Sequence, residues 1–116
     1  MKKNIITKNY LEQKPMRAEH VGWSADENEI ITLEIENKGV FNTIAQKLFK
    51  RPKISYIHLD DIGSLVWPLL DGSKTIIDLG ENVKEKFGEK AEPLYERLAK
   101  YFQILDSYGF IKWRQD

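Results

Sequence analysis

The chain has 116 residues, of which 41% are hydrophobic, and its 18 basic side chains balance 18 acidic ones. This length and apolar content suit a single domain with one core. The absence of cysteine excludes disulfides, thiolate metal sites and cysteine nucleophiles, and the zero net charge argues against nucleic-acid binding. No apolar run is long enough for a membrane-spanning helix, so we expect a soluble protein without stable membrane insertion. The absence of cysteine fits a reducing compartment, so we expect the cytoplasm.

The start of the chain is expected to lie outside the folded domain. Residues 1–18 are polar, show no hydrophobic periodicity and contain Pro15. This composition predicts a tail, or a strand that forms only against a partner. Residues 19–116 are then expected to form the single domain.

Two antiparallel strands are expected next. In EIITLEIE, residues 29–36, Ile31, Leu33 and Ile35 alternate with polar residues. A period of two is typical of a strand with one buried face. The preceding HVGW, residues 20–23, is the expected neighbour of this strand.

A short helix and a third strand should follow. Residues 39–51 place apolar side chains on one helical face and basic ones off it, which predicts an amphipathic insertion. Pro52 ends this helix, because the residue before a proline avoids the helical region. The β-branched and aromatic residues of ISYIHL, residues 54–59, indicate the third strand.

Capping residues mark the two helices after this strand. Asp60 is the expected N-cap of the first helix, and Pro68 should kink or end that helix. A turn at residues 71–73 leads to Thr75, the expected N-cap of the second helix, which Gly88 should stop.

The longest helix is expected at about residues 91–107. Pro93 is tolerated in its first turn, and Gly109 should end it. Residues 110–113 are a candidate closing strand. The order of elements predicts an α+β winged helix-turn-helix: a small antiparallel sheet against three main helices, with the amphipathic helix inserted between strands two and three.

No residues are arranged for catalysis. His20 and His58 lie far apart, without carboxylates at metal-ligand spacing. There is no phosphate-binding glycine loop and no nucleophile with a base at a recognisable spacing. We therefore expect neither enzymatic activity nor a bound cofactor or metal.

Two segments carry more apolar surface than one core requires. The third strand has apolar groups on both faces, so as an edge strand it suits an extended peptide. The long helix has an apolar stripe that covers most of its circumference, which indicates burial from several sides or contact with a partner.

Short motifs follow one another from residue 59 to residue 79. They are Leu59-Asp60, Gly63 with Val66-Trp67, Leu69-Leu70-Asp71-Gly72, and Thr75-Ile76-Ile77-Asp78-Leu79. In this order, followed by the long helix and Gly109-Phe110-Ile111, they resemble the PqqD family, the recognition elements of ribosomally made, modified peptides. The resemblance covers about residues 54–113.

The resemblance implies a non-catalytic adaptor. Such a protein captures the leader segment of a precursor peptide as an added β-strand and presents it to a modifying enzyme, often a radical SAM enzyme. The site would lie between the third strand and the long helix, where the helix positions follow from the stripe geometry. Its peptide-binding residues would be Ile54, Ser55, Tyr56, Ile57, His58, Tyr95, Leu98, Phe102 and Leu105.

Two departures from the family pattern and two other functions stay open. Pro68 and the insertion at residues 39–51 are unusual for the family, and the insertion suits covering the cleft, docking an enzyme, touching an acidic membrane or capping the sheet. A homodimeric module would use the wide stripe of the long helix. A winged-helix DNA-binding regulator would contact phosphates through Arg97, Lys100, Lys112 and Arg114.

Overall fold

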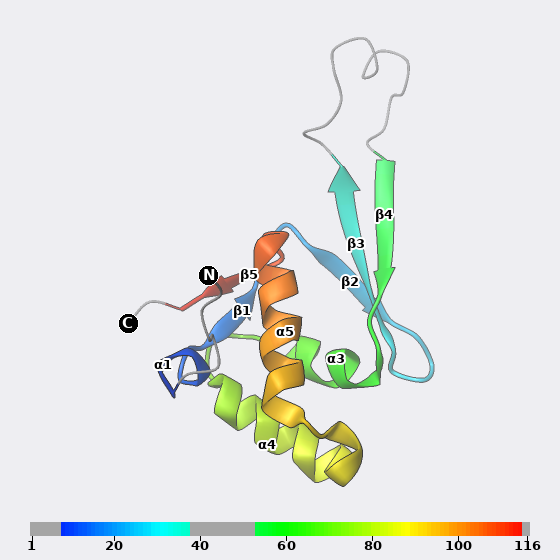
Figure 1. The fold of residues 1–116 in the computed structure, drawn as a ribbon. Coiled ribbons are helices and arrows are strands. Elements are labelled where there is room, and N and C mark those ends of the chain that lie inside the picture. Colours follow the sequence, from blue (N-terminus) through cyan, green and yellow to red (C-terminus); the bar gives the residue numbers. More distant parts are fainter. Residues whose placement is uncertain (1–7, 38–52, 115–116) are drawn as a thin grey trace.

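The computed structural model describes residues 8–37 and 53–114. It is an α+β fold with two small antiparallel sheets and several helices (Figure 1). In chain order the elements are α1 (Lys8–Leu11), β1 (Pro15–Arg17), β2 (Gly22–Ala25), β3 (Ile31–Asn37), β4 (Lys53–His58), α3 (Asp61–Val66), the 3-10 helix η1 (Trp67–Leu69), α4 (Ile76–Phe87), the 3-10 helix η2 (Gly88–Ala91), α5 (Leu94–Ser107) and β5 (Ile111–Trp113). The expected insertion at residues 39–51 lies outside the described residues.

The larger sheet has the order β2-β3-β4, so the three expected strands are confirmed. Trp23 of β2 lies opposite Leu33 of β3, which in turn lies opposite Ile57 of β4. The predicted alternation is present, because Ile31 and Leu33 are buried while the intervening positions are more exposed. Beyond the body of the molecule, the far halves of β3 and β4 project as an arm (Figure 1).

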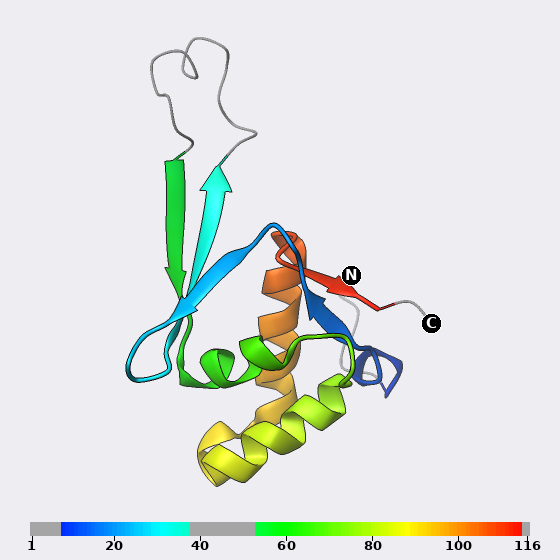
Figure 2. The same cartoon turned by 180° about the vertical axis from the view of Figure 1, so that it is seen from behind.

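The second sheet joins the two ends of the described chain. Pro15–Arg17 pairs with Ile111–Trp113, and Figure 2 shows these strands side by side near the C-terminal end of α5. Ala18 donates its backbone N–H to Phe110 over 3.0 Å. The closing strand therefore exists, but it pairs with residues expected in a tail and not with the larger sheet.

The predicted caps are confirmed. The Asp60 carboxylate accepts the backbone N–H of Gly63 at 2.7 Å. Thr75 and Asp78 cap α4 reciprocally, with each side chain accepting the other residue's backbone N–H. Pro68 lies inside η1, so the α-helix ends before the proline and continues only as a 3-10 turn.

The Asp71–Ser73 turn is also present. The Ser73 hydroxyl donates to the Asp71 carboxylate at 2.6 Å, and this hydrogen bond lowers the pKa of Asp71. Gly72 has a φ of 84°, a conformation that side-chain-bearing residues rarely adopt. A Cβ at this position would also lie 2.8 Å from the Met16 sulfur of β1.

The longest helix starts later than expected. Residues 88–91 form η2, and α5 begins at Leu94 with Pro93 as its N-cap residue. The Glu92 carboxylate accepts the Leu94 N–H at 3.1 Å, which satisfies one of the free amides at the helix start. The predicted start at residue 91 is therefore corrected by three residues.

The core lies where α5 meets the other elements. Fully buried side chains come from β3, η1, α4 and α5; they include Leu33, Trp67, Leu79, Leu98 and Phe102. The helices α4 and α5 approach closely at Gly80, where an added Cβ would lie only 2.5 Å from the Tyr95 ring. The N-terminal part of α5 therefore packs directly on α4.

Candidate functional site

Strand β4 is an edge of the larger sheet, and among the described residues it pairs only with β3. The N–H of Leu59, just after β4, donates to Ile31 at 2.9 Å. Because such bonds alternate along an antiparallel pair, Ile57 and Ser55 also direct their backbone groups to β3. The backbone groups of the residues between them point to the outer edge: Ile54, Tyr56 and His58.

Strand β4 carries three large hydrophobic side chains that are exposed to solvent. The exposed fractions are 61% for Tyr56, 41% for Ile54 and 38% for Ile57. Tyr56 and Ile54 share the outer sheet face with His58, whose Nδ1 lies 2.7 Å from the Thr32 hydroxyl. Ser55, on the opposite face, is half-buried. Exposed apolar strand edges are normally avoided because they pair with other chains.

The helix residues predicted for the site are buried or half-buried within the fold. Leu98 and Phe102 are fully buried in the core, and Leu105 is 4% exposed. Tyr95 is half-buried at the interface between α5 and α4, where its hydroxyl contacts the carbonyl of Ile77 at 3.4 Å. The buried leucines and phenylalanine offer no surface to a ligand in this conformation.

A different flank of α5 carries the accessible apolar groups. Ile104 is 48% exposed and Tyr108 is 68% exposed. One turn before Ile104, the half-buried Tyr101 donates its hydroxyl to the carbonyl of Gly63 at 3.1 Å. Burial raises the pKa of Tyr101, and the nearby charge of Asp60 adds to this effect.

Tyr101 connects this flank to the end of β4. An added Cβ on Gly63 would lie 2.9 Å from the Tyr101 ring and 3.4 Å from the Leu59 Cβ, so these side chains meet around this glycine. Tyr101 and Ile104 belong to the wide apolar stripe of this helix but were not among the residues predicted for the site. Helical periodicity gives the stripe without showing which flank the rest of the fold covers.

The described residues hold no group of three or more metal-ligating side chains. Two of the four candidate phosphate contacts already bind the protein itself. Arg97 donates to the carbonyl of Lys90, and Arg114 donates to that of Gly72, each at 3.1 Å. In residues 8–37 and 53–114, no helix has the length and apolar character needed to cross a membrane.

The sequence model of one family, described as coenzyme PQQ synthesis protein D (PqqD), matches residues 29–111. This match spans most of the chain, from the start of β3 to β5. The chain belongs to the PqqD family. No curated protein and no solved structure shows a significant match.

PqqD is the family of recognition elements for ribosomally made, modified peptides. The resemblance noted for the motifs between residues 59 and 79 is therefore confirmed. The PqqD match includes β4 and the accessible flank of α5 but leaves out β1 and β2. Both parts of the candidate site thus lie within the family region.

Proposed function

We propose that this PqqD-family chain is a non-catalytic adaptor that binds the leader segment of a precursor peptide along β4. The observation that carries this proposal is an edge strand with exposed apolar side chains on both faces. PqqD-family proteins bind precursor peptides and the biosynthetic enzymes that act on them, and are themselves accessory proteins.

The backbone of β4 supports binding by strand addition. The outward N–H and C=O groups of Ile54, Tyr56 and His58 form the row that an added strand needs. Main-chain hydrogen bonds would supply affinity with little dependence on the peptide's sequence. Specificity would come from alternate peptide side chains, which reach the two faces of the extended sheet.

The helix side of the site would be the flank made by Tyr101, Ile104 and Tyr108. These side chains are at least partly accessible, and Tyr101 lies beside the residue that follows β4. Leu98, Phe102 and Leu105 then act as the core beneath this flank and do not touch the peptide. Tyr95 fixes the packing of α5 on α4.

The scaffold fits a winged helix-turn-helix. The helices α3 and α4, joined by the Asp71–Ser73 turn, would be the helix-turn-helix, and α5 would be the third helix. The adaptor would act in the cytoplasm and deliver its leader to a modifying enzyme, for which a radical SAM enzyme is our first candidate.

The proposal predicts that Tyr56→Pro weakens leader binding by about tenfold or more, because proline removes an outward N–H and blocks the neighbouring pairing. Ala25→Pro is the matched control: the bond from Asp26 to Ile30 shows that Ala25 directs its N–H away from β3 at the opposite edge. Tyr56→Ala keeps the backbone N–H and removes the aromatic side chain, so it separates the effect of the side chain on binding from that of the backbone.

These affinities can be measured by calorimetry with leader peptides from short reading frames beside the gene. We expect Ala25→Pro to bind the leader peptide like the unmodified chain. The affinity of Tyr56→Ala should lie between those of the two proline variants. Equal affinity for Tyr56→Pro and the unmodified chain, with both folded by circular dichroism, would exclude strand addition at β4.

A further inference from the structure

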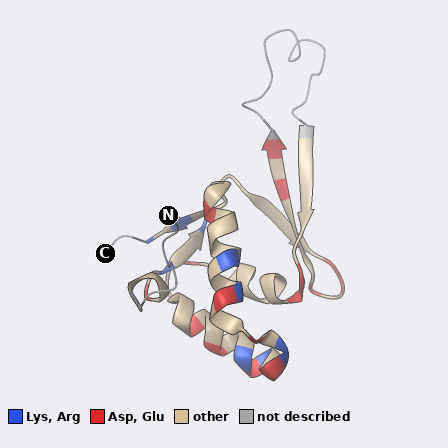
Figure 3. Ribbon diagram, viewed as in Figure 1, with Lys and Arg blue, Asp and Glu red and all other residues tan. Residues whose placement is uncertain are grey.

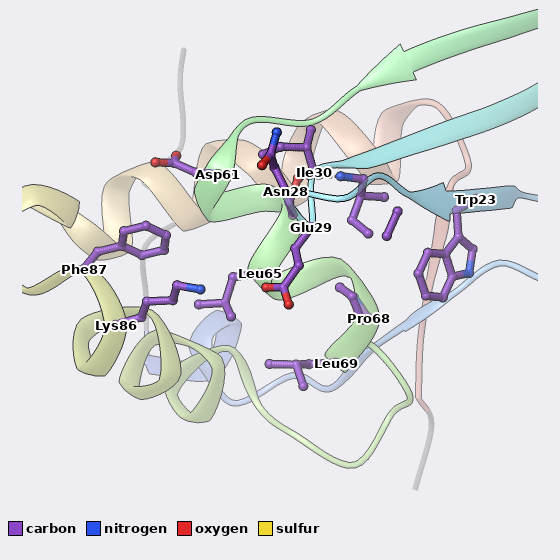
Figure 4. A pocket seen from close by; sticks show the side chains of 13 residues that line it. Trp23, Asn28, Glu29, Ile30, Asp61, Leu65, Pro68, Leu69, Lys86 and Phe87 are labelled. Carbon is purple, nitrogen blue, oxygen red and sulfur yellow. Dashed lines mark hydrogen bonds between the residues drawn. The ribbon is translucent and has the colours of Figure 1, made fainter.

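A pocket of about 520 Å³ lies at the other edge of the larger sheet, and none of its lining residues belongs to β4. Its walls come from β2, the β2–β3 turn, α3 with η1, and the end of α4 (Figure 4). Much of the lining is apolar: Trp23, Ile30, Leu65, Pro68, Leu69 and Phe87. These side chains are exposed or half-buried, so their apolar surface is accessible to a ligand.

Charged side chains stand around this apolar surface. Two of the three charged lining residues, Glu29 and Asp61, are acidic, and the third is Lys86. Figure 4 shows the Glu29 and Lys86 side chains reaching toward the space beside Leu65, with Asp61 at the edge of the pocket.

The turn that carries Glu29 is held in place by Asp26. The Asp26 carboxylate accepts the N–H groups of Asn28 and Ile30 at 2.8 and 2.9 Å. Glu29 itself has a φ of 65°, a conformation that costs energy for a residue with a side chain. The backbone of this turn is thus held in one conformation, which places the exposed Glu29 side chain beside the pocket.

The turn beside the pocket is acidic, whereas Lys86 lines the pocket and the Arg17 guanidinium lies 5.4 Å from the centre of the Trp23 ring. The β2–β3 turn contains Asp26, Glu27 and Glu29 and has no basic residue. In Figure 3 acidic residues colour this turn and the start of α3. A ligand that complements this surface combines a large apolar group with positive charge.

We propose that this pocket docks the modifying enzyme through a segment in which a large apolar side chain lies next to lysine or arginine. The inference rests on the proposed adaptor function. An adaptor has to hold leader and enzyme at the same time, and the two edges of the larger sheet provide separate surfaces for them. The leader occupies the β4 edge, and the enzyme occupies the β2 side.

The test uses charge variants of the full chain with the purified modifying enzyme encoded beside its gene. Lysine and glutamate tolerate the positive φ of this position about equally, so Glu29→Lys should keep the turn. It should weaken enzyme binding by about tenfold or more. Glu27→Lys is the matched control, because it makes the same change on the same turn at a residue that does not line the pocket. We expect less than about a threefold effect there, because Glu27 does not line the pocket and solvent screens a charge that no bound segment covers. Lys86→Gln should leave binding unchanged or make it tighter.

Leader binding, measured in parallel, separates this inference from the proposed function. Glu29→Lys should bind leader like the unmodified chain. If it also binds the enzyme unchanged, or if Lys86→Gln weakens enzyme binding, the docking proposal is overturned while the leader site stands. If the unmodified chain binds enzyme in a Glu29-dependent way but no leader, the adaptor function fails. Self-association in ultracentrifugation that Glu29→Lys abolishes would assign the pocket to a second copy of the chain, and would overturn enzyme docking.

Discussion

At the level of single residues, Gly80 sets the distance between α4 and α5. Alanine usually stabilises a helix interior by up to about 1 kcal/mol relative to glycine. Here the new Cβ would lie 2.5 Å from the Tyr95 ring. We therefore predict that Gly80→Ala lowers the free energy of unfolding by about 1–3 kcal/mol, because the interface is overpacked. Urea unfolding measures this change, with the exposed Glu81→Ala as control; a gain in stability for Gly80→Ala would contradict the packing described.

Two half-buried tyrosines predict a loss of stability in alkali. Burial, with a smaller effect of Asp106, raises the pKa of Tyr10 to about 12, and burial also raises that of Tyr101. In the unfolded chain both hydroxyls lose their protons near pH 10. Between this pH and the folded pKa the native state binds more protons, so stability falls as pH rises.

The alkaline loss should be measured by chemical unfolding between pH 8 and about pH 11. Tyr101→Phe should be less stable at neutral pH because it loses the hydrogen bond to the Gly63 carbonyl, but its stability should fall less steeply as the pH rises. An identical slope for Tyr101→Phe and the unmodified chain would show that Tyr101 does not titrate differently on folding.

Which residues cap and turn the chain could be predicted from the sequence, because those roles depend on near neighbours. Asp60, Thr75 and Gly72 act within a few residues of their own position. How deeply each residue of α5 is buried depends on segments that are far away in the sequence. Periodicity therefore showed a wide stripe but could not separate the buried Phe102 from the exposed Ile104.

At the level of elements, Arg17 connects β1 to the rest of the fold. Its guanidinium donates to the carbonyls of Trp67 and Pro68 at 3.2 and 2.9 Å, which satisfies acceptors around η1. It also lies 5.4 Å from the centre of the Trp23 ring on β2. One side chain thus contacts elements from both sheets and the 3-10 helix between α3 and α4.

Replacing Arg17 by methionine keeps an unbranched apolar stem and removes these polar contacts. We predict a loss of about 1–3 kcal/mol in the free energy of unfolding, because two carbonyls lose a charged donor. Lys112→Met, on the exposed side of β5, is the control and should change stability by less than about 0.5 kcal/mol. Thermal unfolding of the two variants gives the comparison, and equal melting temperatures would mean that Arg17 contributes little.

The pairing of β1 with β5 shows where prediction from the sequence stops. These strands are only three residues long and come from opposite ends of the chain. Such short segments show no periodicity, and their partners can be identified only in the folded structure. The three strands of the larger sheet were easier to predict, because the alternation in β3 extends over seven residues.

At the level of the whole molecule, the larger sheet has two edges with different surroundings. The β4 edge carries exposed apolar side chains, while the β2 side borders a pocket beside acidic residues. The PqqD family supplies the general role, and the edge strand supplies a place for a peptide backbone. The β4 half of the proposed site was predicted from the sequence, whereas the helix half was proposed only from the fold.

The most direct test of the leader site is amide hydrogen exchange, followed by NMR with and without a leader peptide from a reading frame beside the gene. Strand addition predicts new protection at the outward amides of Ile54, Tyr56 and His58. The amides of Ser55 and Ile57, which already face β3, should change much less. Chemical shifts should also move at Tyr101 and Ile104 and saturate with the same affinity. Equal changes at all five strand amides, or saturable binding with no protection in β4, would contradict peptide binding by strand addition.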